Sequence, residues 1–120
     1  MLIPHLHFDG ECKDAITLYE RAFCTKCDEI YFYDENLINH ARMEIHGQTV
    51  FLNDNPFFAN KDGSSCFPVH LIVTFKTTDE LTACYNILKN NDEYPFVKTD
   101  HSELCGNFQD KFGVWWGFMV

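Results

Sequence analysis

Basic residues are scarce in this sequence. Its 120 residues include nine Lys and Arg against eighteen Asp and Glu, which gives a formal net charge of −9. Proteins that bind nucleic acid use Lys and Arg to displace counterions from phosphates, and anionic membrane surfaces attract the same side chains. We therefore expect neither nucleic acid nor a membrane among the partners. A small-molecule ligand is not excluded, because the field inside a pocket can oppose the net charge.

Long apolar runs and a leader pattern are also missing. The longest apolar stretches fall far short of the roughly 20 residues that a membrane-spanning helix needs. The segment Met1–His5 has no basic region followed by a long apolar run, so we expect no signal peptide and a cytoplasmic location. Under that expectation, the six cysteines predict reduced thiols rather than a disulfide framework.

Common catalytic signatures are absent as well. The sequence has no Gly-rich phosphate loop, no Gly-x-Ser-x-Gly elbow and no His-Glu-x-x-His motif. One Cys-x-x-Cys occurs, from Cys24 to Cys27, but it follows the end of a predicted helix. A redox pair sits instead at a helix N-terminus, where the helix dipole lowers the thiol pKa. We interpret these cysteines as incidental thiols.

The first half of the chain has a strong apolar periodicity. Ala15, Leu18, Tyr19 and Ala22 follow the i, i+3, i+4, i+7 spacing of one helix face. Alternating apolar and polar residues are typical of strands that are covered on one face. Together these patterns predict a strand within residues 1–9, a helix ending near residue 23, a strand over 29–34, and a hairpin of strands over 40–45 and 49–53.

The same order of elements returns after a polar loop at residues 54–66. A strand over 68–75 is followed by a helix that begins at the capping box of Thr77 and Glu80. Three candidate strands come next, over 94–100, about 104–109 and 114–120. We therefore expect an α+β fold of two βαβββ modules, with the bounds 1–55 for module 1, 56–65 for the linker and 66–120 for module 2.

A shift of 65 residues aligns the two halves and places His5 on His70. In each first strand the uniformly apolar face should pack under the helix, so His5, His7, His70 and Ile72 should point to the other side of the sheet. Two such sheets, curved and placed side by side, would enclose a cup in which His5 and His70 meet.

Two features leave alternatives open. Phe57 and Phe58 lie in the polar loop, where they either plug the edge of the core or form a pocket lid or subunit contact. His40, Arg42 and Glu44 share the polar side of the predicted hairpin, where they are either solvated or able to reach a ligand.

Five segments resemble the PhnB-like family of the vicinal oxygen chelate superfamily, which also includes glyoxalase I, bleomycin-resistance proteins and extradiol dioxygenases. Together they span essentially the whole chain, and the last, Asp-Lys-Phe-Gly with nearby Trp, is the most specific. These segments are His5–Gly10, Leu18–Phe23, Ile38–Ile45, Leu52–Asn55 and Asp110–Trp116. Some relatives carry a 3-demethylubiquinone methyltransferase label, but no methyl-donor motif occurs here, so we do not carry that label over.

The resemblance implies paired βαβββ units, usually assembled as homodimers. It also implies, for the metal-dependent members, a His or similar ligand on the first strand of each unit and a carboxylate on the last strand. The first-strand positions fall near His5 and on His70, and the last-strand positions fall near Leu52 and Gly117. Neither of the latter is a carboxylate, and two imidazoles alone are half of the usual ligand set.

The sequence therefore favours a small-molecule-binding protein of the bleomycin-resistance type, forming a homodimer, without a complete metal site and without a bound cofactor. The alternative is a metal-dependent lyase, isomerase or dioxygenase-type enzyme that uses His5 and His70. No catalytic residue is assigned. We expect the pocket to be lined by His5, His7, Leu52, His70, Ile72, Trp115 and Gly117.

Overall fold

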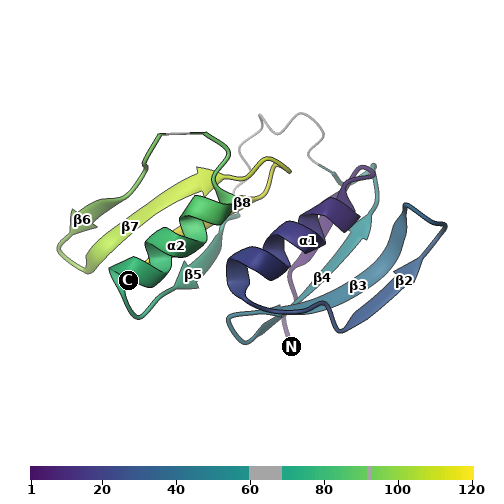
Figure 1. The fold of residues 1–120 in the computed structure, drawn as a ribbon, viewed down its shortest axis with the longest axis horizontal. Coiled ribbons are helices and arrows are strands. Elements are labelled where there is room, and N and C mark those ends of the chain that lie inside the picture. Colours follow the sequence, from purple (N-terminus) through teal and green to yellow (C-terminus); the bar gives the residue numbers. More distant parts are fainter. Residues whose placement is uncertain (60–68, 92) are drawn as a thin grey trace. The chain divides into compact units, whose positions relative to one another are not determined.

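Each half of the chain folds into its own βαβββ module. The computed structural model describes residues 1–59, 69–91 and 93–120, and the chain divides into two units, Met1–Lys61 and Asp62–Val120. Of the predicted linker at 56–65, residues 60–65 lie outside the described part. The predicted α+β fold of two βαβββ modules is confirmed: each unit contains one four-stranded sheet and one helix (Figure 1).

The sheet of unit 1 has the strand order β1-β4-β3-β2. β1 runs parallel to β4, and the other neighbouring strands are antiparallel. The parallel pair needs a crossover connection, since parallel strands cannot be joined by a tight turn. The elements are β1 (His5–Phe8), α1 (Cys12–Phe23), β2 (Glu29–Phe32), β3 (Ile38–Ile45) and β4 (Gln48–Asp54).

The sheet of unit 2 repeats this topology with the strand order β5-β8-β7-β6. β5 is parallel to β8, and β8, β7 and β6 pair in antiparallel fashion. The helix begins where the capping box predicted it, because the Thr77 side chain accepts a hydrogen bond from the Glu80 N–H at 3.1 Å. The elements are β5 (Leu71–Thr74), α2 (Thr78–Leu88), β6 (Val97–Thr99), β7 (Ser102–Gln109) and β8 (Trp115–Met119).

In each unit the helix lies across one face of the sheet, which we call the helix face (Figure 1). In unit 1 the Phe8 ring lies 6.4 Å from that of Tyr19, and both residues are buried. In unit 2 the Tyr85 ring of α2 packs edge-on against Phe108 at 5.0 Å. Each fully buried side chain of this size stabilises the fold by roughly 1.5–3 kcal/mol. The opposite side of each sheet, which its own helix leaves uncovered, is the open face.

A buried carboxylate joins three segments of unit 1. Asp54, at the end of β4, accepts a hydrogen bond from the Cys12 N–H at 3.1 Å and another from the Ile38 N–H at 2.9 Å. Cys12 is the first residue of α1, whose N-cap residue, Glu11, makes no side-chain capping bond. Asp54 therefore caps the helix from a distant strand, and it also places the start of β3.

A second buried carboxylate, Asp110, closes the loop between β7 and β8. Only 2% of this residue is exposed. One carboxylate oxygen accepts from the backbone N–H groups of Phe112 and Val114, and the other accepts from the Trp116 indole N–H at 2.9 Å. Gly113 in the same loop has φ of 91°, a conformation that glycine adopts at little cost. The Asp-Lys-Phe-Gly segment and its following Trp thus form one hydrogen-bonded structural unit.

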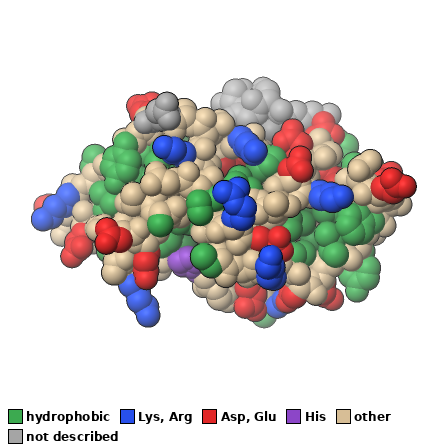
Figure 2. Space-filling view, viewed as in Figure 1, with side chains coloured by type: hydrophobic (Ala, Val, Ile, Leu, Met, Phe, Trp, Pro, Cys, Tyr) green, Lys and Arg blue, Asp and Glu red, His purple; other side chains and the backbone are tan. Residues whose placement is uncertain are grey.

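Surface charge on the side drawn in Figure 2 is mixed. Lys and Arg side chains are dispersed among acidic ones and form no continuous patch among the residues described. None of the helices in the described ranges is long and apolar enough to cross a bilayer.

The burial of the Asp54 carboxylate predicts that its removal lowers the free energy of unfolding more than removal of the exposed Asp34 carboxylate does. Asp54→Ala leaves two buried N–H groups without an acceptor, and each unsatisfied group costs about 1–3 kcal/mol. We expect a loss of about 2–5 kcal/mol in the free energy of unfolding, measured by urea denaturation. Asp34 provides the matched control, because it also accepts two backbone N–H bonds, from Asn36 and Leu37, but in an exposed turn. An equal loss for Asp34→Ala and Asp54→Ala would contradict the role of burial.

Candidate functional site

The open face of unit 1 brings together imidazole, aromatic and amide side chains from three strands. In the parallel pair of β1 and β4, His5 lies beside Phe51 and His7 lies beside Asn53. On the next strand, Arg42 is opposite Phe51, so His40, two residues away on β3, faces the same side. The polar side of the β3–β4 hairpin therefore shares its face with the histidines of β1. The sequence had left open whether this side is solvated or can reach a ligand.

The rings on this face form a continuous layer. The centroid of His5 is 4.2 Å from that of His7 and 6.0 Å from that of Phe51. His40 contacts Phe51 edge-on at 4.7 Å and stacks against Tyr31 of β2 at 6.2 Å. Three imidazoles and two aromatic rings thus lie next to one another on a face that α1 does not cover.

A hydrogen bond orients the ring of His7, and partial burial affects the pKa of His5. His7 Nδ1 lies 2.7 Å from Asn53 Oδ1. Because an amide oxygen only accepts, the Nδ1 of His7 carries the proton and donates it. Partial burial lowers the pKa of His5, and the nearby His7 and His40 lower it further. The His5 imidazole is therefore neutral near pH 7 and offers one donor and one acceptor.

Arg42 on β3 pairs with two carboxylates of unit 1. Arg42 forms an ion pair with Asp28, and its other terminal nitrogen is 3.5 Å from Glu44 and 3.2 Å from the Thr49 hydroxyl. The guanidinium is thus shared between carboxylates of its own unit.

Phe57 and Phe58 do not plug the core. They are 86% and 61% exposed, and their rings meet edge-on at 4.9 Å. Phe58 also contacts His7, with a centroid distance of 5.0 Å. The exposed pair therefore extends the ring layer of unit 1 at its β1 end, which contradicts the core alternative, while the lid or subunit contact stays a prediction.

Leu52 does not belong to the open face. It pairs with Leu6, is completely buried and lies on the helix face. The reason is the strand register. A shift of 65 residues places Leu6 of β1 on Leu71 of β5. Leu6 pairs with Leu52 and Leu71 pairs with Trp116, so the last strands β4 and β8 correspond with a shift of 64. Since side chains alternate along a strand, one residue of slip moves Leu52 to the opposite side of its sheet. The expectation that Leu52 lines a pocket is therefore corrected to its neighbours Phe51 and Asn53.

The open face of unit 2 carries a stacked pair of rings. His70 and Trp115 lie 5.5 Å apart with an interplanar angle of 20°. Ile72 pairs with Gly117, which pairs with Asn107 on β7, so all three share this face. Ile72 is 58% exposed. A Cβ on Gly117 would lie 2.4 Å from Ile72 and 2.8 Å from the Asn107 amide oxygen, so these two side chains close over the glycine.

Solved structures share the two-module fold. A PhnB protein from Bacillus cereus is 24% identical, with a TM-score of 0.81, and the match covers 98% of this chain and 97% of that one. A protein from Pseudomonas aeruginosa is 20% identical with a TM-score of 0.83, covering 99% and 96%. A bleomycin-binding protein in complex with bleomycin is 13% identical with a TM-score of 0.62, again covering 99% and 96%. No curated protein sequence matches the chain.

These structures and the duplicated βαβββ unit define the class: the chain has the fold of the vicinal oxygen chelate superfamily. Within that class, the family model described as 3-demethylubiquinone-9 3-methyltransferase matches residues 1–119, and the chain belongs to this PhnB-like family. The family resemblance predicted from the sequence is thereby confirmed.

The donor set does not fit the divalent metal of the superfamily's enzymes. On the open faces, the last strands present Phe51 and Asn53 in unit 1, and Trp115 and Gly117 in unit 2. None of these is a carboxylate, and the space above Gly117 is filled by Ile72. Within residues 1–59, 69–91 and 93–120, no three His, Cys, Asp or Glu side chains gather as metal ligands. Among the described residues of the last strands, neither open face presents the anionic ligand that would offset the charge of a divalent ion.

The Cys-x-x-Cys pair lies at the end of α1. Cys24 is the exposed C-cap residue, with φ of 52°. The half-buried Cys27 thiol donates toward the backbone carbonyls of Glu29 and Arg42. Burial raises the pKa of Cys27, and the carboxylates of Glu20 and Asp28 raise it further, although the two carbonyl contacts oppose this shift. Both its position at the helix end and this shift run against a redox pair, whose attacking thiol needs a lowered pKa.

Alkylation rates test this interpretation of the thiols. At pH 8 a raised pKa leaves less of Cys27 as the reactive thiolate, so iodoacetamide should modify exposed Cys24 several-fold faster than Cys27. Buried Cys12, whose pKa is also raised by burial and by Asp54, should react only after unfolding. Peptide mass spectrometry over a time course gives the order of labelling. Labelling of Cys27 ahead of Cys24 would show a lowered pKa and restore the redox hypothesis.

Proposed function

We propose that this chain is a small-molecule-binding protein of the PhnB-like and bleomycin-resistance type, which holds a planar, ring-containing ligand without a complete metal site. The ligand lies against the open face of a module. The observation that carries the proposal is the ring layer: on both sheets, the face without a helix presents adjacent imidazole and aromatic rings. Flat rings of this kind bind planar ligands by stacking and edge contacts.

The polar groups among these rings support the same function. Ligand pockets are mostly apolar, with a few polar groups that fix the ligand's orientation. In unit 1 the neutral His5 and the His7–Asn53 pair provide such groups, and in unit 2 Asn107 lies near Ile72 over Gly117. The bleomycin-binding protein gives an example of this fold in complex with an organic ligand.

A homodimer in the cytoplasm completes the proposal. β2 is an edge strand of its sheet, and it and the following residue expose Ile30, Tyr31, Phe32 and Tyr33. An exposed, aromatic edge strand is a surface that natural proteins generally cover. Pairing with a second copy of the chain would bury these side chains.

Matched aromatic and saturated probes test ring recognition. We expect 2-naphthol to bind with at least about fivefold higher affinity than decahydro-2-naphthol in calorimetric titrations, because only the aromatic probe stacks on Trp115. Trp115→Ala should weaken 2-naphthol binding by about 2- to 10-fold, the equivalent of roughly 0.5–1.5 kcal/mol.

Tyr94→Ala is the control variant for this experiment, since Tyr94 is another exposed aromatic residue of unit 2 whose ring contacts are with Tyr85 and Phe96 on the helix side. It should leave 2-naphthol affinity unchanged. Equal binding of the saturated and aromatic probes, or no binding of either, would overturn the proposed function.

Elemental analysis tests the absence of a complete metal site. Protein purified without chelator should contain less than stoichiometric nickel, zinc, manganese or iron, because neither module supplies a carboxylate beside its first-strand histidine. One metal per chain, lost in His5→Ala or His70→Ala but retained in His101→Ala, would instead establish the metal-dependent alternative. His101 is the control because it is an exposed histidine in the turn between β6 and β7.

A further inference from the structure

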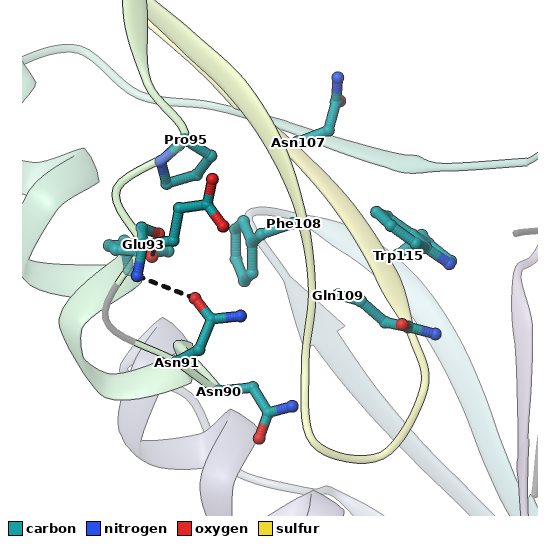
Figure 3. Close-up of a pocket in the computed structure, with 9 residues that line it drawn as sticks. Asn90, Asn91, Glu93, Pro95, Asn107, Phe108, Gln109 and Trp115 are labelled. Carbon is teal, nitrogen blue, oxygen red and sulfur yellow. Dashed lines mark hydrogen bonds between the residues drawn. The ribbon is translucent and has the colours of Figure 1, made fainter. Parts of the chain in front are cut away.

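A pocket of about 340 Å³ lies at one edge of the unit 2 sheet (Figure 3). This volume is at the lower end of the range for small-molecule sites. Its walls come from the end of α2, the segment that leads into β6, and the last part of β7 with Trp115. The lining residues are Tyr85, Asn90, Asn91, Glu93, Pro95, Asn107, Phe108, Gln109 and Trp115.

The pocket exists because the chain before β6 leaves the sheet. β6 pairs with β7 at Val97↔Cys105 and Thr99↔Ser102, and the described pairing ends there. The Tyr85 hydroxyl donates to the Glu93 carbonyl at 2.7 Å and holds the departing segment against α2. Gly106 permits the close approach, since a Cβ there would lie 2.5 Å from the Pro95 carbonyl oxygen. The second half of β7 is thus left beside a recess instead of a paired strand.

The pocket connects the two sides of the sheet. Phe108 faces α2, whereas Asn107 and Gln109 alternate to the open face, where Gln109 is opposite Trp115. Figure 3 shows the Glu93 side chain reaching toward Phe108, with Asn90 and Asn91 on the same side and Trp115 beyond the β7 strand. A molecule stacked on Trp115 can therefore extend around the edge of β7 into the recess.

Among the residues that the structure describes, the polar lining consists of four carboxamides and one carboxylate, with no Lys, Arg or His. The Asn91 oxygen accepts from the Glu93 N–H at 2.9 Å, which leaves its amide nitrogen to donate. The Gln109 nitrogen donates to the Gly113 carbonyl at 3.2 Å, which leaves its oxygen to accept. Asn90 makes no hydrogen bond to any part of the chain that is described. The lining thus offers donors and acceptors together but no cation.

We propose that this pocket binds an uncharged, hydrogen-bonding group of the ligand, such as a carboxamide, while the ligand's planar ring lies against Trp115. This inference rests on the proposed function and names the class of ligand: a neutral aromatic compound with an amide-like substituent. Carboxamides pair with amides as both donor and acceptor. An anionic substituent is disfavoured, because the Glu93 carboxylate would face it and no cation in the lining would neutralise it.

An isosteric pair of probes tests the inference: 2-naphthamide, which is neutral, and 2-naphthoate, which is anionic at pH 7.5. We expect calorimetry to give at least about tenfold tighter binding of the amide, with NMR shifts at the side-chain NH₂ groups of the Asn and Gln residues and at an indole N–H. Asn90→Ala should weaken 2-naphthamide by about 3- to 10-fold, as the loss of a hydrogen bond predicts. Glu93→Gln should tighten 2-naphthoate selectively.

Asn86→Ala is the matched control, because Asn86 is an exposed asparagine of α2 that does not line the pocket. It should change neither affinity. If both probes bind equally and Asn90→Ala has no effect, while 2-naphthol still binds more tightly than its saturated counterpart, the carboxamide pocket is overturned and the proposed function stands. If no aromatic probe binds, both are overturned.

Discussion

The buried carboxylate of Asp54 is the interaction on which the arrangement of unit 1 depends. From the end of β4 it accepts hydrogen bonds from the first N–H of α1 and from the first N–H of β3. Three elements, α1, β3 and β4, therefore meet at one carboxylate. Asp54 itself pairs with Phe8 in the register that sets His5 beside Phe51 and His7 beside Asn53. The carboxylate therefore lies on the helix side of the same strand pair whose other side carries the imidazole layer.

Asp110 has the corresponding role in unit 2, and it explains the most specific sequence segment of the chain. Its carboxylate accepts hydrogen bonds from backbone N–H groups of the β7–β8 loop and from the indole N–H of Trp116. Trp116 is buried on the helix face. Trp115, the next residue back along β8, is consequently turned to the open face, where it stacks on His70. The segment that identifies the family thus has a structural role, and it sets the side of the sheet on which its neighbour Trp115 lies.

Sequence patterns predicted the modules well because they depend on local periodicity. The alternation in residues 5–8 and 71–74 located the helix faces, and the capping box of Thr77 located the start of α2. The candidate site was harder to predict from the sequence, because it depends on the register between strands that are far apart in the chain. A single 65-residue shift could not reveal that β4 and β8 align with a shift of 64, so Leu52 was placed on the wrong face. No periodic pattern in the sequence indicated the pocket beside β7, because the pocket results from the departure of the chain before β6 from the sheet.

Because Ile72 and Asn107 close over Gly117, the two modules differ in how easily each could accommodate an acidic residue on its last strand. In unit 1 a single change, Asn53→Asp, would place a carboxylate on the open face beside His7. In unit 2 the equivalent change at Gly117 would bring its side chain against the δ-methyl group of Ile72, which would have to turn aside. An acidic residue on the last strand of both modules therefore requires a rearrangement of Ile72 in addition to the two substitutions.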